Sequence, residues 1–352
     1  MNENIYEMFD NILTSDFKII DEGVKKIVEL GRNAEYGRLE TYSIFPGIIL
    51  AYIDMNIDHM EDVFVEDNVS SRMLELNHCL AGRYAYQVGD DKIIYFEKGD
   101  LCISVSDVTK VVSDFPLGYY KGLEIFMDID GANESIRKYL PDFDIVKFYE
   151  KLKNDNNYVL VRANESIDHV IGELYDVDER IKLEYFRLKC IELLLFFSIT
   201  DFKDDNKLSL SQKQAEIVEN VKNDLIHDLD SQITIDELAD KYEISKTSLK
   251  NCFKEVYGKP IFKWRKEYRL DYACKLIERD ELTISEISGM VGYSSPSNSL
   301  RHSRIMLDAP LHSIANNFLS FWYIDKLFSS NTFIYLFLLY FILKFGLSNH
   351  FF

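Results

Sequence analysis

Five side chains that could bind base edges or phosphates fall within a short stretch of this chain: Lys246, Thr247, Lys250, Asn251 and Lys254. Lysine can donate to guanine O6 and N7 or to a phosphate, asparagine can pair with the adenine edge, and threonine can contact the thymine methyl group. Their spacing places them on one face of a helix. We therefore predict base-edge contacts for the first four and a phosphate contact for Lys254. A merely solvated helix face is the alternative.

An apolar stripe and two flanking signals predict the elements that position these side chains. Leu249, Phe253 and Val256 recur at i, i+4 and i+7, which would hold the helix against its neighbours. Ser245 is a suitable N-cap for this helix, and Asp236–Tyr242 has the pattern of a short supporting helix. Two short helices separated by a tight turn form the outline of a helix-turn-helix, whose second helix enters the major groove of DNA.

This pattern occurs twice, in Ile233–Ser248 and again in Leu282–Ser297. A solvated helix face would explain the charges but not the duplication. A helix predicted over Ile261–Ile277 joins the copies, and its Arg269 could meet a phosphate or an internal acid. The matched pairs are Thr234 and Thr283, Glu237 and Glu286, Leu238 and Ile287, Ser245 and Ser294, and Ser248 and Ser297. The residues predicted to contact DNA are Lys246, Thr247, Ser248, Lys250, Asn251, Lys254, Arg269, Ser295, Pro296, Ser297 and Asn298.

The charge of the chain is divided between a basic segment and an acidic remainder. The 352 residues carry a formal net charge of −19. The segment Lys246–Arg279 contains ten basic and four acidic residues, so its net charge is +6 and the remainder carries −25. A single basic surface on an acidic body suits phosphate binding at one place.

The N-terminal half predicts an antiparallel β-barrel of cupin-like type, which with its helices gives an α+β fold class. Residues up to about 35 have Ile, Leu and Val at mixed spacing, and we expect one or two short helices there. From about residue 39 to 130, short apolar runs alternate with turn residues at Ala81–Gly82, Gly89–Asp91 and Lys98–Asp100. Such spacing is typical of a sandwich or barrel.

The sequence contains no pattern that favours catalysis, a metal or another cofactor. A metal-binding barrel needs converging His and carboxylate ligands, whereas His59 and His78 are far apart and neither lies in an H-x-H pair. The barrel could instead bind a small molecule, because closed sheets of this size can hold one ligand. The candidate ligand-binding residues are Glu75, Asn77, His78, Arg83 and Tyr84.

Helices are predicted over 132–200, followed by a polar linker at 201–211. The most apolar helical segment is Ile181–Ser198, which we expect to be buried against the barrel or shared with a second subunit. A helix over Gln212–Leu229 then leads into the first helix-turn-helix. The five cysteines form no C-x-x-C pair, and the N-terminus has no signal-peptide pattern, which indicates a cytoplasmic protein.

The first copy, continued through Lys259-Pro260 and Trp264-Arg265, and the second copy's Val291-Gly-Tyr-Ser-Ser-Pro-Ser-Asn298 resemble the DNA-binding domain of the AraC/XylS family of bacterial transcriptional regulators. The resemblance covers roughly 210–298. It implies two recognition helices in successive major grooves of promoter DNA, contact with RNA polymerase, and usually activation. It also implies a cupin-like domain that senses a small-molecule effector and forms a homodimer. The resulting domains are a sensor and dimerisation domain at 1–200, a DNA-binding domain at 212–300 and an atypical hydrophobic tail at 301–352.

The chain departs from this pattern at Ser299. The second recognition helix needs two large apolar residues four apart, yet the available pairs are Ser299 with Ser303 or Asn298 with His302. Losing two buried apolar side chains costs about 2–5 kcal/mol each, so the second helix-turn-helix is expected to be impaired. The tail could anchor the chain to a membrane, but its uninterrupted apolar run, Phe333–Leu343, is 11 residues long, short of the roughly 20 that a spanning helix needs.

Two functions from different classes follow. The first is a sequence-specific DNA-binding transcriptional regulator with an N-terminal sensor. The alternative is a small-molecule-binding or catalytic cupin-like protein whose DNA-binding half no longer works.

We predict that a one-base frameshift near Asn298 produced the tail. Codons permitted for Asn298–Leu311 can be chosen so that the shifted frame reads Phe-Phe-Ala-Ala-Phe-Lys-Asn-Tyr-Val-Gly-Cys-Ser-Pro, which restores the missing helix. Sequencing the gene across these codons is the measurement. If neither neighbouring frame encodes an apolar helix there, the frameshift hypothesis is wrong.

Overall fold

The computed structural model describes residues 17–57, 72–88, 91–107, 113–199, 209–278 and 282–292. The chain divides into two compact units, one made of Met1–Ile226 with Ile233–Arg265 and the other of His227–Gln232 with Lys266–Phe352. All the described strands and the first copy of the repeat belong to the first unit. The described part of the second copy belongs to the second unit.

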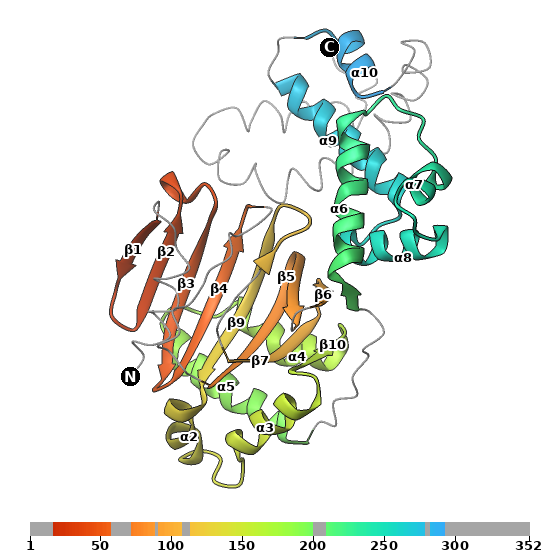
Figure 1. The fold of residues 1–352 in the computed structure, drawn as a ribbon. Coiled ribbons are helices and arrows are strands. Elements are labelled where there is room, and N and C mark those ends of the chain that lie inside the picture. Colours follow the sequence, from red (N-terminus) through yellow and green to blue (C-terminus); the bar gives the residue numbers. More distant parts are fainter. Residues whose placement is uncertain are drawn as a thin grey trace, which may run out of the picture. The chain divides into compact units, whose positions relative to one another are not determined.

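Within the described residues the first unit contains eleven strands, and every strand pairing is antiparallel (Figure 1). The main order is β1-β2-β3-β4-β9-β5-β6-β11, while β7 and β8 also pair with β5, and β10 pairs with β7. The antiparallel β-domain expected from the sequence is therefore present. The strands are β1 (Phe17–Asp21), β2 (Lys25–Leu30), β3 (Gly37–Phe45), β4 (Ile48–Met55), β5 (Arg72–Val88), β6 (Lys92–Glu97), β7 (Leu101–Asp107), β8 (Ser113–Asp114), β9 (Tyr120–Asp128), β10 (Tyr158–Val161) and β11 (Ser209–Ser211).

Strand β5 is 17 residues long and joins two parts of the β-domain. Its first part pairs with β7 and β9, and its last part pairs with β6 and β8. The register shifts between Cys79 and Ala81, and Gly82 has φ 88°, where a Cβ would lie 2.3 Å from the carbonyl oxygen of Tyr119. The turn predicted at Ala81–Gly82 is thus wrong: the strand continues through a bulge that only glycine fits.

Alternating side chains of these strands enter two different cores. In β4, Ile48 and Leu50 face the cluster shared with the helices, whereas Ile49, Ala51 and Ile53 belong to the cluster inside the β-domain. Because neighbouring residues of a strand point to opposite faces, a strand covered on both sides reads as a continuous apolar run. This explains the unbroken apolar sequence of β4.

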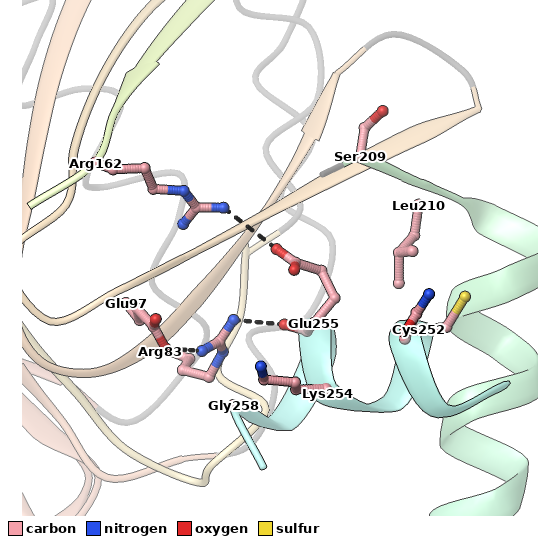
Figure 2. A pocket seen from close by; sticks show the side chains of 10 residues that line it. Arg83, Glu97, Arg162, Ser209, Leu210, Cys252, Lys254, Glu255 and Gly258 are labelled. Carbon is pink, nitrogen blue, oxygen red and sulfur yellow. Dashed lines mark hydrogen bonds and ion pairs between the residues drawn. The ribbon is translucent and has the colours of Figure 1, made fainter. Parts of the chain in front are cut away.

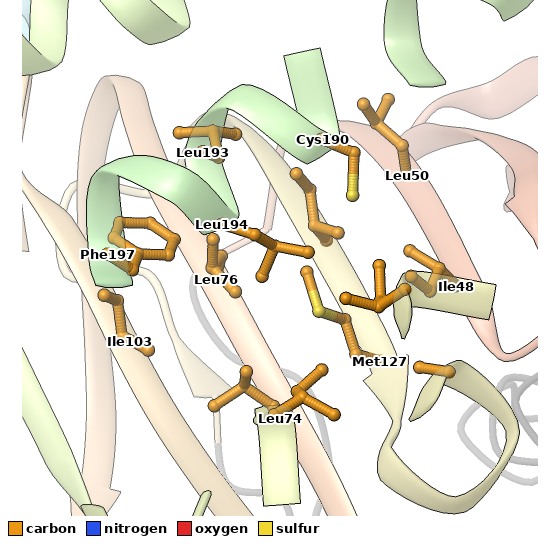
Figure 3. Close-up of a cluster of buried hydrophobic side chains, with 14 of the residues drawn as sticks. Ile48, Leu50, Leu74, Leu76, Ile103, Met127, Cys190, Leu193, Leu194 and Phe197 are labelled. Carbon is orange, nitrogen blue, oxygen red and sulfur yellow. The ribbon is translucent and has the colours of Figure 1, made fainter. Parts of the chain in front are cut away.

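Helices cover one face of the sheet (Figure 1). They are α2 (Ile129–Arg137), α3 (Ile145–Asp155), α4 (Glu165–Gly172) and α5 (Lys182–Ile199), with short 3-10 turns η1 (Arg32–Ala34) and η2 (Glu173–Tyr175). Helix α5 packs onto the sheet through the apolar cluster that the sheet shares with the helices, and it contributes Leu193, Leu194 and Phe197 (Figure 3). On the same helix, Leu188 is 68% and Leu195 49% exposed. One face of α5 is therefore buried against the sheet, which agrees with the expectation that this helix packs on the barrel. Another face of α5 is apolar and exposed.

Five further helices follow the β-domain. They are α6 (Gln212–His227), α7 (Ile235–Lys241), α8 (Lys246–Tyr257), α9 (Ile261–Glu278) and α10 (Ile284–Met290). The bounds of α7, α8 and α9 agree with the sequence expectations to within one or two residues. The boundary between the two units falls inside α9, after Arg265.

A further expectation about local structure is wrong within the described residues. Helices were expected up to about residue 35, yet from residue 17 onward β1 and β2 form a hairpin whose connection contains Gly23 at φ 85°. The β-branched residues of these strands, such as Ile27 and Val28, suit a half-buried sheet better than a helix. The expected linker at 201–211 ends in strand β11, which pairs with β6, and its remaining residues lie outside the described ranges.

The second recognition helix and the tail also lie outside the described residues, which end at 292. This applies to the predicted DNA contacts of Ser295, Pro296, Ser297 and Asn298, to the departure at Ser299, and to the hydrophobic tail at 301–352.

We predict that Leu194→Ala destabilises the first unit by about 2–5 kcal/mol, because the side chain is fully buried and its removal leaves a cavity. Leu80→Ala is the matched control: Leu80 is 38% exposed at the bulge of β5, and its loss should cost less than about 1 kcal/mol. Urea unfolding followed by circular dichroism measures both. Equal losses would contradict the packing described for α5.

Candidate nucleic-acid interface

The first helix-turn-helix begins with a capping box at Thr234. The Thr234 hydroxyl accepts a hydrogen bond from the backbone N–H of Glu237 at 3.2 Å, and the Glu237 carboxylate accepts one from the backbone N–H of Thr234 at 2.7 Å. These bonds satisfy two N–H groups that the helix leaves unpaired. The backbone N–H of Thr234, and its hydroxyl, which donates to the same carboxylate at 2.9 Å, lower the pKa of Glu237. The box therefore fixes where α7 begins.

Helix α8 is held by the apolar stripe that the sequence predicts. Ser245 caps it, with its hydroxyl 3.1 Å from the backbone nitrogen of Ser248. Leu249 and Phe253 are completely buried, and the Phe253 ring meets the Trp264 ring edge-on with centroids 5.7 Å apart. The helix thus presents a fixed outer face, because its inner face is locked by packing.

The predicted reading residues lie on this outer face. Lys246, Thr247, Lys250, Asn251 and Lys254 are all exposed. Lys246 forms an ion pair with Asp236 of α7 at 2.5 Å. Because both side chains are more than half exposed, water screens the pair and it is worth little. Ser248 is partly buried beside the Cys252 sulfur, so it faces inward more than the other members of the set.

The second unit repeats the first capping box at Thr283. The Thr283 hydroxyl accepts from the Glu286 backbone N–H at 3.3 Å, and the Glu286 carboxylate accepts from the Thr283 backbone N–H at 2.8 Å. Ile287 and Val291 of this unit are buried with Leu276 of α9. The duplicated sequence therefore has duplicated local structure through α10.

Arg269 is engaged inside the second unit. Its Nη2 donates to the carbonyl oxygen of Leu229, while its Nε is buried without a partner. Gly292, with φ 77°, packs against the same carbonyl: a Cβ there would lie 2.2 Å from the Leu229 oxygen. The Leu229 carbonyl, which precedes the first copy, thus contacts both Arg269 and Gly292 at the end of α10. The hydrogen bond to Leu229 occupies part of the Arg269 guanidinium that was predicted to contact phosphate.

The five candidate ligand-binding residues divide among three environments. Tyr84 belongs to the cluster inside the β-domain, where its ring stacks on Phe96 with centroids 4.9 Å apart. In the same interior, Asn77 donates to the Glu124 carboxylate and accepts from the Tyr120 hydroxyl. Glu75 faces this group, because it interacts with Asn77 and with Glu124. The interior thus holds a polar cluster in apolar surroundings.

Burial changes the protonation of this cluster. It raises the pKa of Glu75 to about 7, against the hydrogen bond with Asn77, which lowers it. Burial, and then the neighbouring Glu75 carboxylate, hold the pKa of Glu124 well above its usual range. Removing a carboxylate from water disfavours its charged form. Burial therefore favours the protonated form of both carboxyl groups relative to carboxyls in water.

His78 and Arg83 leave the interior. His78 lies on the helix side of β5, with Nδ1 2.9 Å from the hydroxyl of Tyr175, and burial lowers its pKa to about 4. Arg83 points toward α8: its guanidinium pairs with the Glu97 carboxylate and donates to the carbonyl oxygen of Glu255 (Figure 2). Strand alternation and the bulge separate residues that are close in the sequence.

Sequence reasoning missed Arg162 and Glu255, which join Arg83 at this place. Arg162 follows β10, and its guanidinium reaches the Glu255 carboxylate at 3.4 Å (Figure 2). These residues are 93 positions apart, and no local pattern links them. Only the pairing of β10 with β7 places Arg162 there.

Comparison with known proteins identifies the type of domain. A family model described as a helix-turn-helix domain matches residues 238–314, a range that extends past Asn298. Over 91 residues the chain is 32% identical to the probable transcription factor PqrA of Proteus vulgaris, in an alignment that spans 24% of this chain and 75% of PqrA. The chain belongs to the AraC/XylS family of transcriptional regulators. It is a DNA-binding transcriptional regulator, as the duplicated motif predicts.

Two solved structures align with this chain over most of its length. The alignment with ToxT of Vibrio cholerae covers 71% of this chain and 91% of the ToxT chain, at 13% identity and a TM-score of 0.28. The AraC-like transcriptional activator CuxR covers 77% and 90%, at 10% identity and a TM-score of 0.28. TM-scores this low support no further comparison.

In the described part of this regulator, no group of three or more His, Cys, Asp or Glu side chains is arranged to hold a metal ion. Of the described helices, none has both the length and the apolar character needed to cross a membrane.

We predict that Glu75→Gln reduces the pH dependence of stability. Because the folded pKa of Glu75, about 7, lies above the ordinary glutamate value of 4.5, the folded state binds more protons between these values. Stability is then largest at low pH and falls as pH rises through that window. Melting temperatures at pH 5 and pH 8 should differ less for Glu75→Gln than for the wild type. The exposed control Glu134→Gln should keep the wild-type difference, and an unchanged difference in Glu75→Gln would contradict the shift.

Proposed function

We propose that this regulator reads promoter DNA through α8, placed in the major groove with its N-terminal half against the base edges. Lys246, Thr247, Lys250 and Asn251 contact bases, and Lys254 and Ser248 assist at the backbone. In the second copy, Ser295, Pro296, Ser297 and Asn298 begin the corresponding contact, and Arg269 completes it at a phosphate. The second copy contributes less affinity than the first, because its predicted helix lacks the two apolar anchors.

One observation carries this proposal: the exposed polar face of α8 stands on a completely packed helix-turn-helix. Side chains on a rigid element lose little order when they bind, so a fixed face suits base readout. Among the described residues, Lys250, Asn251 and Lys254 form no ion pair that would compete with DNA. The local net charge of +6 over Lys246–Arg279 supports association with phosphates.

The remaining parts of the proposal concern partners. A small-molecule effector binds inside the β-domain, near the polar cluster of Glu75, Asn77 and Tyr84. The protein forms a homodimer, for which the exposed apolar side of α5, with Leu188 and Leu195, is the supporting surface. Contact with RNA polymerase and a location in the cytoplasm follow from membership of a family of bacterial transcriptional regulators.

The test is a gel shift on a duplex that the wild-type chain selects from a random-sequence library. Lys250→Ala and Asn251→Ala should each weaken binding to this duplex by about 1–3 kcal/mol and relax its sequence preference. Lys254→Ala should weaken binding to all sequences and reduce the salt dependence by about one charge.

Lys147→Ala is the matched control, because Lys147 is an exposed lysine of α3 in the β-domain. It should bind as the wild type does. Wild-type affinity in both Lys250→Ala and Asn251→Ala, or a failure of the chain to select any sequence, would contradict the proposal.

A further inference from the structure

The last turn of α8 is held by two arginines of the β-domain, and both sides of this contact belong to the first unit. Arg83, at the second part of β5, donates to the Glu255 carbonyl oxygen. Arg162, after β10, pairs with the Glu255 carboxylate at 3.4 Å (Figure 2). It also pairs with Asp100. One residue of the recognition helix therefore receives two guanidinium groups from outside the helix.

The geometry of this contact suits the end of a helix. The last carbonyl groups of a helix lack intrahelical partners and carry partial negative charge, so a cation placed there is stabilised. Arg83 is only 4% exposed. Gly258 ends α8 at φ 71°, and a Cβ at this position would lie 2.9 Å from Nη1 of Arg83. The glycine cap thus leaves room for the arginine.

The two surfaces also share an apolar core. Ala85 of β5 and Tyr95 of β6 belong to the same buried cluster as Val218 of α6 and Phe253 of α8. Burial raises the pKa of Glu255, while the nearby Arg162 and Arg83 lower it. The Glu255 carboxylate has therefore left water for a site where only the arginines offset the loss of hydration.

A cavity of about 490 Å³ lies beside this contact, and its walls include Asn251 and Lys254 on α8 and Arg83 and Arg162 on the β-domain (Figure 2). Asn251 and Lys254 are two of the residues expected to touch DNA. A recognition helix must enter a groove about 12 Å wide and 8.5 Å deep. Asn251 and Lys254 are themselves exposed, but they share this cavity with Arg83 and Arg162, so a duplex that approached α8 here would meet the β-domain beside them while the arginines hold Glu255.

We propose that Arg83 and Arg162 form an autoinhibitory latch that holds the first recognition helix against the β-domain, and that DNA binding requires this latch to open. The latch rests on the proposed function, because it matters only if α8 reads DNA. Latched molecules bind DNA weakly, and the measured affinity is the intrinsic affinity reduced by the fraction of open molecules.

Arg162→Gln tests the latch from the β-domain side, with the duplex selected by the wild-type chain. If the latched form holds about 80–90% of molecules, the substitution tightens the dissociation constant about five- to tenfold. Removing a positive charge would otherwise weaken DNA binding, so the expected change has the opposite sign to simple electrostatics. Arg180→Gln is the matched control, since Arg180 is 86% exposed and pairs with Asp178 alone among the described residues.

A second measurement follows the helix itself. Hydrogen exchange across the last turn of α8 should be faster in Arg162→Gln than in the wild type or Arg180→Gln, measured at a temperature at which circular dichroism shows all three to be folded, because Arg162→Gln also removes the cation that pairs with the buried Asp100. Equal or weaker DNA binding by a folded Arg162→Gln, with unchanged exchange, would overturn the latch.

Lys250→Ala in the Arg162→Gln background separates the two proposals. If α8 reads DNA, this variant loses the affinity that Arg162→Gln gained and shows a relaxed sequence preference. If Lys250→Ala changes nothing in either background, the proposed function itself fails. If Lys250→Ala weakens binding in both backgrounds but Arg162→Gln does not tighten it, only the latch fails.

Discussion

The alternation of side chains along β5 is the constraint on which most of this structure depends. This strand pairs with β6, β7, β8 and β9, and its residues supply the interior cluster, the helix-covered face and the contact with α8. Its bulge after Cys79 turns Tyr84 into the interior and Arg83 out toward α8. A slip of one residue would exchange these faces and place Leu74 and Leu76 among the polar groups of the interior. One strand therefore sets the core, the polar cluster and the position of the recognition helix.

Buried charge is handled in two different ways in the first unit. Inside the β-domain, no described cation lies beside Glu75 and Glu124, and burial raises the pKa values of both carboxyl groups. At the end of α8, Glu255 meets Arg83 and Arg162, which favour its charged form against the effect of burial. The interior carboxyls are stabilised in their protonated form, whereas the Glu255 carboxylate is stabilised by its ion pair. The difference makes the interior cluster sensitive to pH and the contact at α8 sensitive to competing charges.

Local signals were sufficient for the helix-turn-helix. Ser245 as N-cap, the stripe of Leu249 and Phe253, and Gly258 beyond the last turn define α8, because each acts through atoms within four residues. Both copies also contain the same Thr–Glu capping box. Local reasoning was wrong at β1 and β2, where mixed apolar spacing suggested helices. There, pairing with β3 decides the conformation, and the sequence of a short segment does not show which strand it will pair with.

The sequence by itself determined the first helix-turn-helix, the capping box that begins the second copy, the antiparallel β-domain and the polar face of α8, since the periodicity of apolar residues and the chemistry of helix ends are local properties. Tertiary structure alone decided which candidate residues meet. It divided Glu75, Asn77 and Tyr84 from His78 and Arg83, because strand faces and a bulge separate neighbours. It also brought Arg162 to Glu255 across 93 positions, since strand pairing, which local patterns do not encode, sets long-range proximity.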